Sequence, residues 1–224
     1  MVGTIYVINP NSTDAVTEGI RAAVSALAFP NGITVECLTL AEGPPAIETQ
    51  QDIDQVVTPL CTMVRRLEEK AAAFVIACFS DPGLYSLREI TRKSVLGIAE
   101  SGMLTAMTLG QRIGVISILP VSIPRHQRYF AAMGITSRVA ADKAVNLGVL
   151  DLADAERTLH RMVAVGQKLR DDHGADVLVM GCAGMSRFRA PLEAKVNVPV
   201  VEPTLAAIVM AMSQTILGWT VRLW

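Results

Sequence analysis

Short, continuously apolar segments recur along this chain, and they limit the folds that it can adopt more than any other feature. Residues 73–77 read Ala-Phe-Val-Ile-Ala, and residues 177–180 read Val-Leu-Val-Met. Runs of this kind are typical of parallel β-strands that helices cover on both faces. Longer segments with a helical period separate them, as between residues 50 and 70, where apolar side chains recur three and four positions apart. Strands that alternate with helices predict an α/β fold with parallel sheets.

The strand and helix pattern runs through the chain twice. From Ile5, in the first apolar strand, to Cys78 there are 73 positions, and from Ile113 to Cys182 there are 69. The next apolar strand then begins 17 positions after the first of these cysteines and 16 after the second. We therefore predict two similar parallel-sheet α/β lobes that are related by a pseudo-twofold axis, with the active site in the cleft between the lobes.

The repeat also suggests where the lobes divide. We assign residues 1–98 and 205–224 to the first lobe and residues 99–204 to the second. The last segment of helical period covers about residues 204–217. We expect this final helix to return to the first lobe and complete it.

Composition excludes several classes of protein. With 20 Lys and Arg against 21 Asp and Glu, the formal net charge is −1, so we expect no nucleic-acid partner and no binding to an anionic membrane surface. The N-terminal apolar run has no basic segment before it and stops at Asn9, so no secretory signal is expected. No apolar run approaches the roughly 20 residues of a membrane-spanning helix.

The cysteines indicate the compartment and the kind of site. None of the four has a second Cys or a His at the spacing of a zinc site, so we expect no metal. A chain of this length does not need disulfides, and reduced thiols indicate the cytoplasm. Cys37 ends a predicted strand and Cys61 lies on the apolar side of a predicted helix, so both are interpreted as core residues.

Cys78 and Cys182 occupy a different position, because each follows a predicted buried strand at an equivalent place in the repeat. Ligands of open parallel sheets bind beyond the carboxyl ends of the strands. If each cysteine also opens a helix, the helix N-terminus lowers the thiol pKa. Two thiols on opposite walls of one cleft can remove a proton from one face of a carbon and return one to the other face, which is racemisation without a cofactor. A small core side chain is the alternative for each cysteine taken alone.

Four segments resemble those of the hydantoin racemases. Residues 77–84 read Ala-Cys-Phe-Ser-Asp-Pro-Gly-Leu and residues 178–185 read Leu-Val-Met-Gly-Cys-Ala-Gly-Met, similar to the two signature segments of that family. Residues 8–13, Ile-Asn-Pro-Asn-Ser-Thr, and residues 43–48, Gly-Pro-Pro-Ala-Ile-Glu, resemble two family loops. The resemblance covers nearly the whole chain. It implies two α/β lobes, a site between them, no cofactor, and a homo-oligomer within the superfamily that also contains aspartate, glutamate and allantoin racemases.

The residues after each cysteine indicate the substrate. The amino-acid racemases of the superfamily have Asn-Thr and Thr-His at places where this chain has Phe79-Ser80 and Ala183-Gly184. The loss of polar side chains favours a neutral ring over a free amino acid. We therefore expect a racemase of 5-substituted hydantoins or of the related ureide allantoin, an isomerase in which Cys78 and Cys182 exchange the proton at C5. An aspartate or glutamate racemase, and an inactive small-molecule binding protein of the same fold, remain the alternatives.

Loops at the carboxyl ends of the strands supply the candidate substrate contacts. Backbone N–H groups near the residues that follow each cysteine are expected to stabilise the charge that develops on the C4 oxygen. For the residues of the first loop, a turn and helix cap is the alternative to a ligand contact. The candidates for substrate binding are Asn11, Ser12, Ile47, Phe79, Ser80, Ser117, Ala183 and Gly184.

Two further segments lie outside this site. The segment 124–129, Pro-Arg-His-Gln-Arg-Tyr, is interpreted as the solvated start of a helix. Both tryptophans of the chain, Trp219 and Trp224, come after the last predicted helix. Aromatic side chains so close together often mark an interface, and they support a homo-oligomer.

Overall fold

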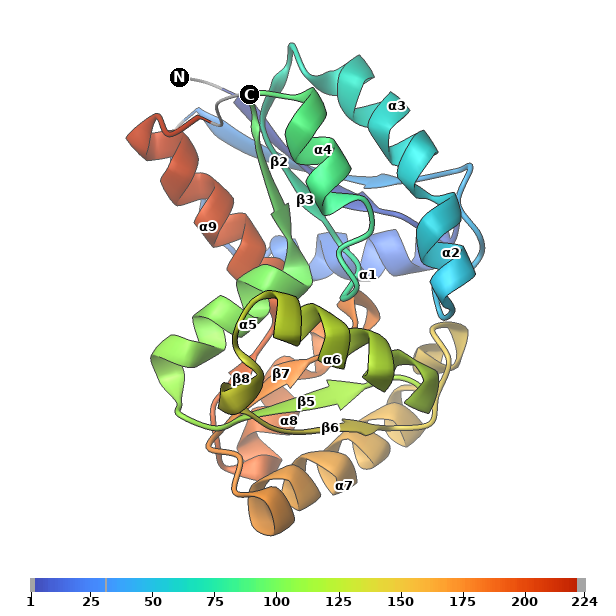
Figure 1. The fold of residues 1–224 in the computed structure, drawn as a ribbon, viewed down its shortest axis with the longest axis vertical. Coiled ribbons are helices and arrows are strands. Elements are labelled where there is room, and N and C mark those ends of the chain that lie inside the picture. Colours follow the sequence, from blue (N-terminus) through green and yellow to red (C-terminus); the bar gives the residue numbers. More distant parts are fainter. Residues whose placement is uncertain (1–2, 31, 221–224) are drawn as a thin grey trace.

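A computed structural model describes residues 3–30 and 32–220 of the chain. It contains two four-stranded parallel sheets with helices around them, so the predicted α/β fold of two similar lobes is confirmed (Figure 1). Trp224, one of the two tryptophans expected at an interface, lies outside the described residues. In the part of the chain that is described, no helix is both long and apolar enough to cross a membrane.

The two sheets have the same strand order. In the first sheet it is β2-β1-β3-β4, and in the second it is β6-β5-β7-β8. All neighbouring strands are parallel. The strands of the first sheet are β1 (Gly3–Asn9), β2 (Ile33–Thr39), β3 (Ala71–Ile76) and β4 (Ser94–Gly97). The strands of the second sheet are β5 (Ile113–Ser117), β6 (Val139–Ala144), β7 (Val177–Met180) and β8 (Val200–Val201).

Helices and helical turns connect the strands in both lobes. In the first half of the chain they are α1 (Asp14–Val24), α2 (Gln50–Gln55), α3 (Val57–Leu67), α4 (Leu84–Ile90) and α5 (Ile98–Leu109). In the second half they are α6 (Ile123–Ala132), α7 (Ala155–His173), α8 (Arg189–Val196) and α9 (Pro203–Leu217), with short 3-10 turns η1 (Pro120–Ser122), η2 (Thr136–Arg138), η3 (Leu150–Ala153) and η4 (Ala183–Phe188). The single helix expected between residues 50 and 70 is two helices, which meet at Val56.

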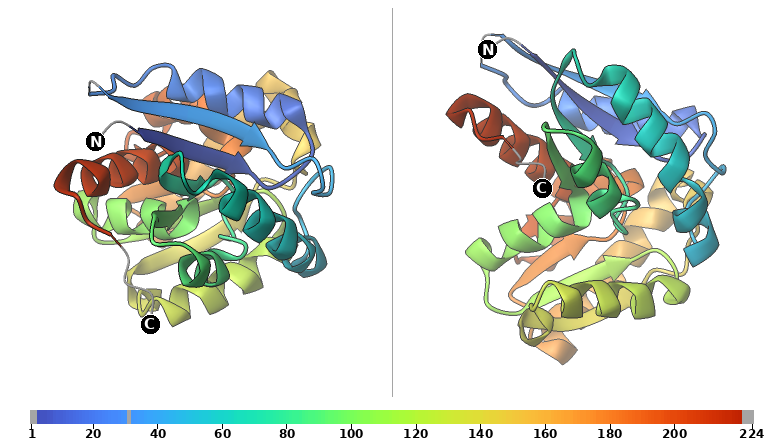
Figure 2. Two further views of the ribbon diagram at one scale, coloured as in Figure 1. Left: turned by 90° about the horizontal axis from the view of Figure 1, so that it is seen from above. Right: turned by 45° about the horizontal axis from the view of Figure 1, so that its top comes forward.

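Two helices join the lobes. Helix α5 begins directly after β4, and α9 begins just after β8 at the corresponding place in the second lobe. They pack against each other, and α9 also lies along β1, β3 and β4 of the first sheet (Figures 1 and 2). At their crossing, a Cβ on Gly102 would lie 2.8 Å from the Cβ of Pro203, so only glycine allows this approach.

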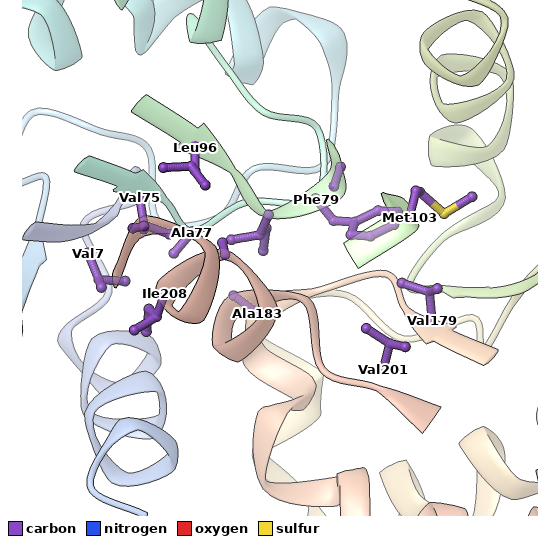
Figure 3. Close-up of a cluster of buried hydrophobic side chains, with 14 of the residues drawn as sticks. Val7, Val75, Ala77, Phe79, Leu96, Met103, Val179, Ala183, Val201 and Ile208 are labelled. Atoms are coloured by element: carbon purple, nitrogen blue, oxygen red, sulfur yellow. The ribbon is translucent and has the colours of Figure 1, made fainter. Parts of the chain in front are cut away.

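One buried apolar cluster runs through both lobes. Figure 3 shows Val7 and Val75 of the first sheet in the same cluster as Val179 and Val201 of the second, with Ile208 of α9 packed among them. Because this core is continuous, the carboxyl ends of the central strands are held in a fixed relation to one another.

Candidate active site

The two cysteines of the repeat occupy equivalent positions. Cys78 lies two residues beyond the end of β3, and Cys182 lies two residues beyond the end of β7. The residue before each cysteine is bonded to the central strand of its sheet: the N–H of Ala77 donates to the Ile8 carbonyl at 2.9 Å, and that of Gly181 to the Ile116 carbonyl at 2.8 Å. The same backbone geometry therefore carries each thiol to the edge where the lobes meet.

Both thiols line one cavity between the lobes, which we call the central cavity. Its volume is about 30 Å³, room for about one water molecule. A substrate ring therefore requires the walls to move apart. The central cavity is lined by Pro10, Asn11, Val16, Ile47, Ala77, Cys78, Phe79, Ser80, Ile118, Ser122, Arg125, His126, Val149, Gly181, Cys182, Ala183 and Gly184.

Most of the substrate-binding candidates meet at this cavity, but two do not line it. Ser117 is fully buried and its hydroxyl hydrogen bonds to the Asp142 carboxylate and His126. The backbone N–H of Ser12 donates to the Pro44 carbonyl at 2.9 Å. Asn11 does line the cavity, although its side-chain oxygen is used within its own turn, where it accepts from the Thr13 N–H at 3.0 Å.

Burial dominates the electrostatics of both thiols. It raises the pKa of Cys78 to about 12, against the opposing effects of the Ser80 N–H and the nearby Arg125 guanidinium. It raises the pKa of Cys182 to about 11, against the effect of the Gly184 N–H, and Glu48 and Glu202 add to the rise. The expectation that helix N-termini bring the thiol pKa values down toward neutrality is therefore wrong, because the loss of water outweighs the backbone donors.

The local structure after each cysteine explains part of that result. Cys182 does precede a helical turn directly, since it is the N-cap of η4. Cys78 does not open a helix, because α4 begins only at Leu84, after a turn that ends at Gly83. The N–H groups of that helix therefore lie too far along the chain to cap the Cys78 thiol. The expectation that each cysteine opens a helix is wrong for Cys78, whereas Cys182 does begin a helical turn.

Asp81 fixes the turn after Cys78. Its backbone adopts a φ of 44°, in the left-handed region, and its N–H donates to the Cys78 carbonyl at 2.9 Å. Its carboxylate accepts hydrogen bonds from the N–H groups of Ala99 and Glu100, at the start of α5, at 2.9 and 2.8 Å. Burial raises the pKa of this carboxyl to about 6. Asp81 thus ties the Cys78 turn to the helix that crosses between the lobes.

The second lobe makes a related connection through Glu202. Its carboxylate accepts from the N–H groups of Thr204 and Leu205 at the start of α9, and from the Ser186 hydroxyl of η4 at 2.8 Å. Burial raises the pKa of Glu202 as well. In each lobe, a buried carboxylate therefore links the segment after the cysteine to the N-terminus of an interlobe helix.

Helix α6 contributes residues that were expected on a solvated surface from the sequence pattern. Arg125 and His126 line the central cavity, and His126 is buried. The signal that could have found them is their spacing, because Ser122, Arg125, His126 and Tyr129 follow the three- and four-residue period of one helix face. The expectation of a solvated segment is wrong for this face of α6.

His126 sits behind Phe79. The two rings meet edge to face with centroids 5.2 Å apart, and the Nδ1 atom of His126 lies 2.8 Å from an Asp142 carboxylate oxygen. Asp142 lies on the edge strand β6. The sequence does not predict this strand, because its mostly half-buried residues, Val-Ala-Ala-Asp-Lys-Ala, form no apolar run.

Arg125 connects the lobes beside the cavity. One terminal nitrogen donates to the Glu48 carbonyl at 3.0 Å and to the Ser122 hydroxyl at 3.2 Å, and the other donates to the Val121 carbonyl at 3.1 Å. The Glu48 carboxylate accepts from the Val149 N–H at 2.8 Å. Within the described residues the Nε of Arg125 is buried without a hydrogen-bond partner.

The remaining cysteines lie elsewhere. Cys37 is buried in β2, where burial raises its pKa to about 11, and Cys61 packs against a second apolar cluster from α3. Neither lines the central cavity. Among the described residues, no group of three or more His, Cys, Asp or Glu side chains could hold a metal ion.

The sequence is similar to a known protein family and to proteins of known activity. The model of the Asp/Glu/Hydantoin racemase family matches residues 5–211. A hydantoin racemase from a Pseudomonas species is 33% identical over 216 residues, which cover 96% of this chain and 86% of the relative.

Solved structures agree with the sequence comparison. The allantoin racemase from Klebsiella pneumoniae superposes with a TM-score of 0.88 at 31% identity, over 98% of this chain and 90% of the other. The allantoin racemase from Pseudomonas fluorescens reaches a TM-score of 0.93 at 26% identity, over 98% and 93% of the two chains.

Proposed function

The chain belongs to the Asp/Glu/hydantoin racemase family, and from that premise we propose that it is a cofactor-independent racemase of cyclic ureides. Its substrate is a 5-substituted hydantoin or the related ureide allantoin, and Cys78 and Cys182 transfer the proton at C5. One observation carries the proposal: the two lobes place their thiols at equivalent positions on the wall of one cavity. The expected family and the isomerase class agree with the names of the relatives.

The reaction needs one thiolate and one thiol. The thiolate removes the C5 proton, and the electron pair left on carbon spreads onto the C4 oxygen. The other thiol then gives its proton to the opposite face of C5, so the product is the mirror image and the two sulfurs have exchanged roles. Either enantiomer is accepted, because either sulfur acts as the base.

Burial in the cavity disfavours the charged thiolate. The groups that lower the thiol pKa must therefore offset this effect. At Cys78 these are the N–H of Ser80 and the Arg125 guanidinium, and at Cys182 the N–H of Gly184. Since these two N–H groups serve the sulfurs, the neighbouring N–H groups of Phe79 and Ala183 remain as candidates to stabilise the C4 oxygen.

The residues beside the sulfurs support a neutral ring. The Phe79 side chain is buried against His126, and Ala183 and Gly184 carry no side-chain donor. The Glu48 and Glu202 carboxylates raise the pKa of Cys182, and the same negative charges oppose a substrate carboxylate nearby.

An amino-acid racemase of the same family is the second candidate, and Arg125 favours it. This cation lines the central cavity, and its buried Nε has no partner among the described residues. A substrate carboxylate could accept a hydrogen bond from it. A two-lobed binding protein without catalysis is the third.

One experiment separates the three. The protein is incubated in D2O with single enantiomers of a 5-alkyl hydantoin, allantoin and glutamate, while optical rotation and deuterium at the acidic carbon are followed. We expect racemisation and deuterium uptake for a cyclic ureide and a lower kcat/KM for glutamate. Best turnover of glutamate would establish the amino-acid racemase, and no exchange in any compound would leave a binding protein.

We also propose that the protein is a homo-oligomer that works in the reducing cytoplasm, where its thiols stay free. Three large apolar side chains are exposed at the end of α9 and just beyond it, where Ile216 is 61%, Leu217 57% and Trp219 64% accessible. Exposed apolar groups so close together support an interface. Light scattering is expected to give a multiple of 24.0 kDa that falls toward the monomer in the Trp219→Ser protein; a monomeric wild type would refute this.

A further inference from the structure

A second cavity adjoins the central one on the side of Cys182, and we call it the side cavity. It has a volume of about 260 Å³ and lies between α1 of the first lobe and the turns η3 and η4 of the second. We propose that it receives the C5 substituent, and that the preferred substrates carry an apolar branched or aromatic group there rather than the polar ureido group of allantoin. This inference rests on the proposed function.

The two cavities are neighbours with a shared wall. Val16, Val149, Ala183 and Gly184 line both. A Cβ built on Gly184 would lie 3.6 Å from the Cys182 sulfur and 3.1 Å from a methyl carbon of Leu152, a residue of the side cavity. Only a small residue therefore separates the reacting sulfur from the side cavity.

The hydroxyls of the side cavity and one terminal nitrogen of Arg187 already have hydrogen-bond partners. That nitrogen donates to the carbonyls of Leu152 and Ala153 at 2.8 and 3.1 Å, and the Arg187 side chain lies at the exposed edge of the cavity. The Ser186 hydroxyl is bonded to Glu202, and that of Thr13 donates to the Pro45 carbonyl at 2.7 Å. A ureido group would lose its hydrogen bonds to water here and find few replacements, which is unfavourable.

Apolar side chains supply the rest of the lining. Val149 and Leu152 are buried, and Val16 and Ala183 line the side cavity together with them. Burying an aliphatic or aromatic substituent against them is favourable. The volume is below that of a typical site for a whole ligand, so it suits one substituent of a ring held between the sulfurs.

A polar cavity on the opposite side is the alternative place for the substituent. It is lined by Gln50, Ser80, Arg125 and Arg128 among others, and these side chains would suit a ureido group. Arg125 lines both that cavity and the central one, and its hydrogen bonds to Glu48 and Ser122 hold it in place. The charged Arg125 thus stands at the junction of this cavity with the central one, whereas Ala183 and Gly184 stand at the junction of the side cavity with the central one.

Racemisation fits a single substituent cavity. The C5 proton leaves from one face and returns on the other, while the substituent keeps nearly the same direction through the planar intermediate. The same side cavity therefore serves both enantiomers, and blocking it is expected to affect both alike.

Gly19 of α1 provides the test. It lines the side cavity but not the central one, and a Cβ built on it meets no atom within 4 Å. Gly19→Leu therefore adds a large side chain to the wall of the side cavity without a steric clash at Cβ, and we expect it to narrow the cavity. It also replaces glycine with a good helix former. Ala22→Leu is the matched control, because Ala22 lies on the same helix, is exposed, and lines neither cavity.

The measurement is kcat/KM for racemisation of 5-benzylhydantoin, 5-methylhydantoin and allantoin by the full-length protein. We expect wild type to prefer the benzyl compound to allantoin. Gly19→Leu is expected to lower the ratio of benzyl to methyl turnover by about tenfold or more for both enantiomers, and Ala22→Leu is expected to leave it unchanged. An unchanged ratio in Gly19→Leu, or a wild type that prefers allantoin, would overturn the inference alone. No C5 exchange with any of the three compounds would overturn the proposed function and this inference with it.

Discussion

The Tyr129 hydroxyl donates a 2.8 Å hydrogen bond to the carboxylate of Asp81. Tyr129 belongs to α6 of the second lobe, whereas Asp81 belongs to the turn that follows Cys78 in the first. The same carboxylate caps the start of α5, and a Cβ on Gly97 would lie within 2.5 Å of its atoms. The Cys78 turn is therefore held by both lobes and leaves no room for a side chain at Gly97.

Asp81 is expected to make stability depend on pH. Its pKa is raised from 3.8 to about 6 because the carboxyl is buried. A raised pKa means that the folded state binds the proton more tightly than the unfolded state. The resulting stabilisation is complete below about pH 4 and is lost as the pH rises through about 6.

Asp81→Asn removes this titration. Urea unfolding of both proteins at several values between pH 4 and pH 7 measures the difference in their free energies of unfolding. As the pH rises, the wild type is expected to lose up to about 3 kcal/mol of stability relative to the Asp81→Asn protein. If the free energies of unfolding of the two proteins changed with pH in parallel, Asp81 would not titrate in this range.

Arg125 is expected to set the reactivity of Cys78. Its positive charge lowers the thiol pKa, so Arg125→Gln is expected to raise that pKa by about one unit. Alkylation by iodoacetamide follows the thiolate, and its rate against pH reports the change. The measurement uses a Cys37→Ala, Cys61→Ala, Cys182→Ser background, in which Cys78 is the remaining thiol.

Arg128→Gln is the control for this experiment. Arg128 lies on the same helix, is exposed, and contacts Gln50 at 3.3 Å without lining the central cavity. Arg128→Gln is expected to leave the pH dependence of the Cys78 alkylation rate unchanged. If Arg125→Gln does not move the profile either, the guanidinium has no influence on the sulfur.

The strand pattern and the repeat could be predicted from the sequence because burial on both faces leaves an unbroken apolar run. The edge strand β6 could not, since most of its residues are only half-buried and the charged residues Asp142 and Lys143 interrupt any apolar run. The break of the helix at Val56 leaves no mark in the apolar period. Local sequence patterns indicate a strand or helix where its side chains are fully buried, and they give little indication where burial is partial.

The site could be predicted only in part for a similar reason. The cysteines stood out because the repeat placed them at equivalent strand ends. Arg125 and His126 are polar residues at a helix start, and such residues look alike in sequence whether they face water or a cavity between lobes. The thiol pKa values depend on how much water the closed lobes exclude, which is a property of tertiary structure.

Cys37 and Cys61 are expected to be dispensable for the reaction, because both lie in apolar packing away from the central cavity. The Cys37→Ala, Cys61→Ala protein is expected to keep kcat/KM within about twofold and to lose on the order of 1–2 kcal/mol of stability. The check is thiol-directed inactivation of this protein. If it resisted alkylation while still racemising its substrate, the reactive thiols would lie elsewhere.

The two sulfurs are expected to act together, one removing the C5 proton and the other returning a proton to the opposite face. The most direct test follows each enantiomer of a 5-substituted hydantoin in D2O with Cys78→Ser and Cys182→Ser, after circular dichroism has shown that both proteins fold. Each variant is expected to lose racemisation by at least about 10²–10⁴-fold, and residual exchange of C5 hydrogen is expected to be confined to one enantiomer, opposite for the two variants. Racemisation near the wild-type rate by either variant, or residual exchange of the same enantiomer by both, would contradict the two-cysteine mechanism.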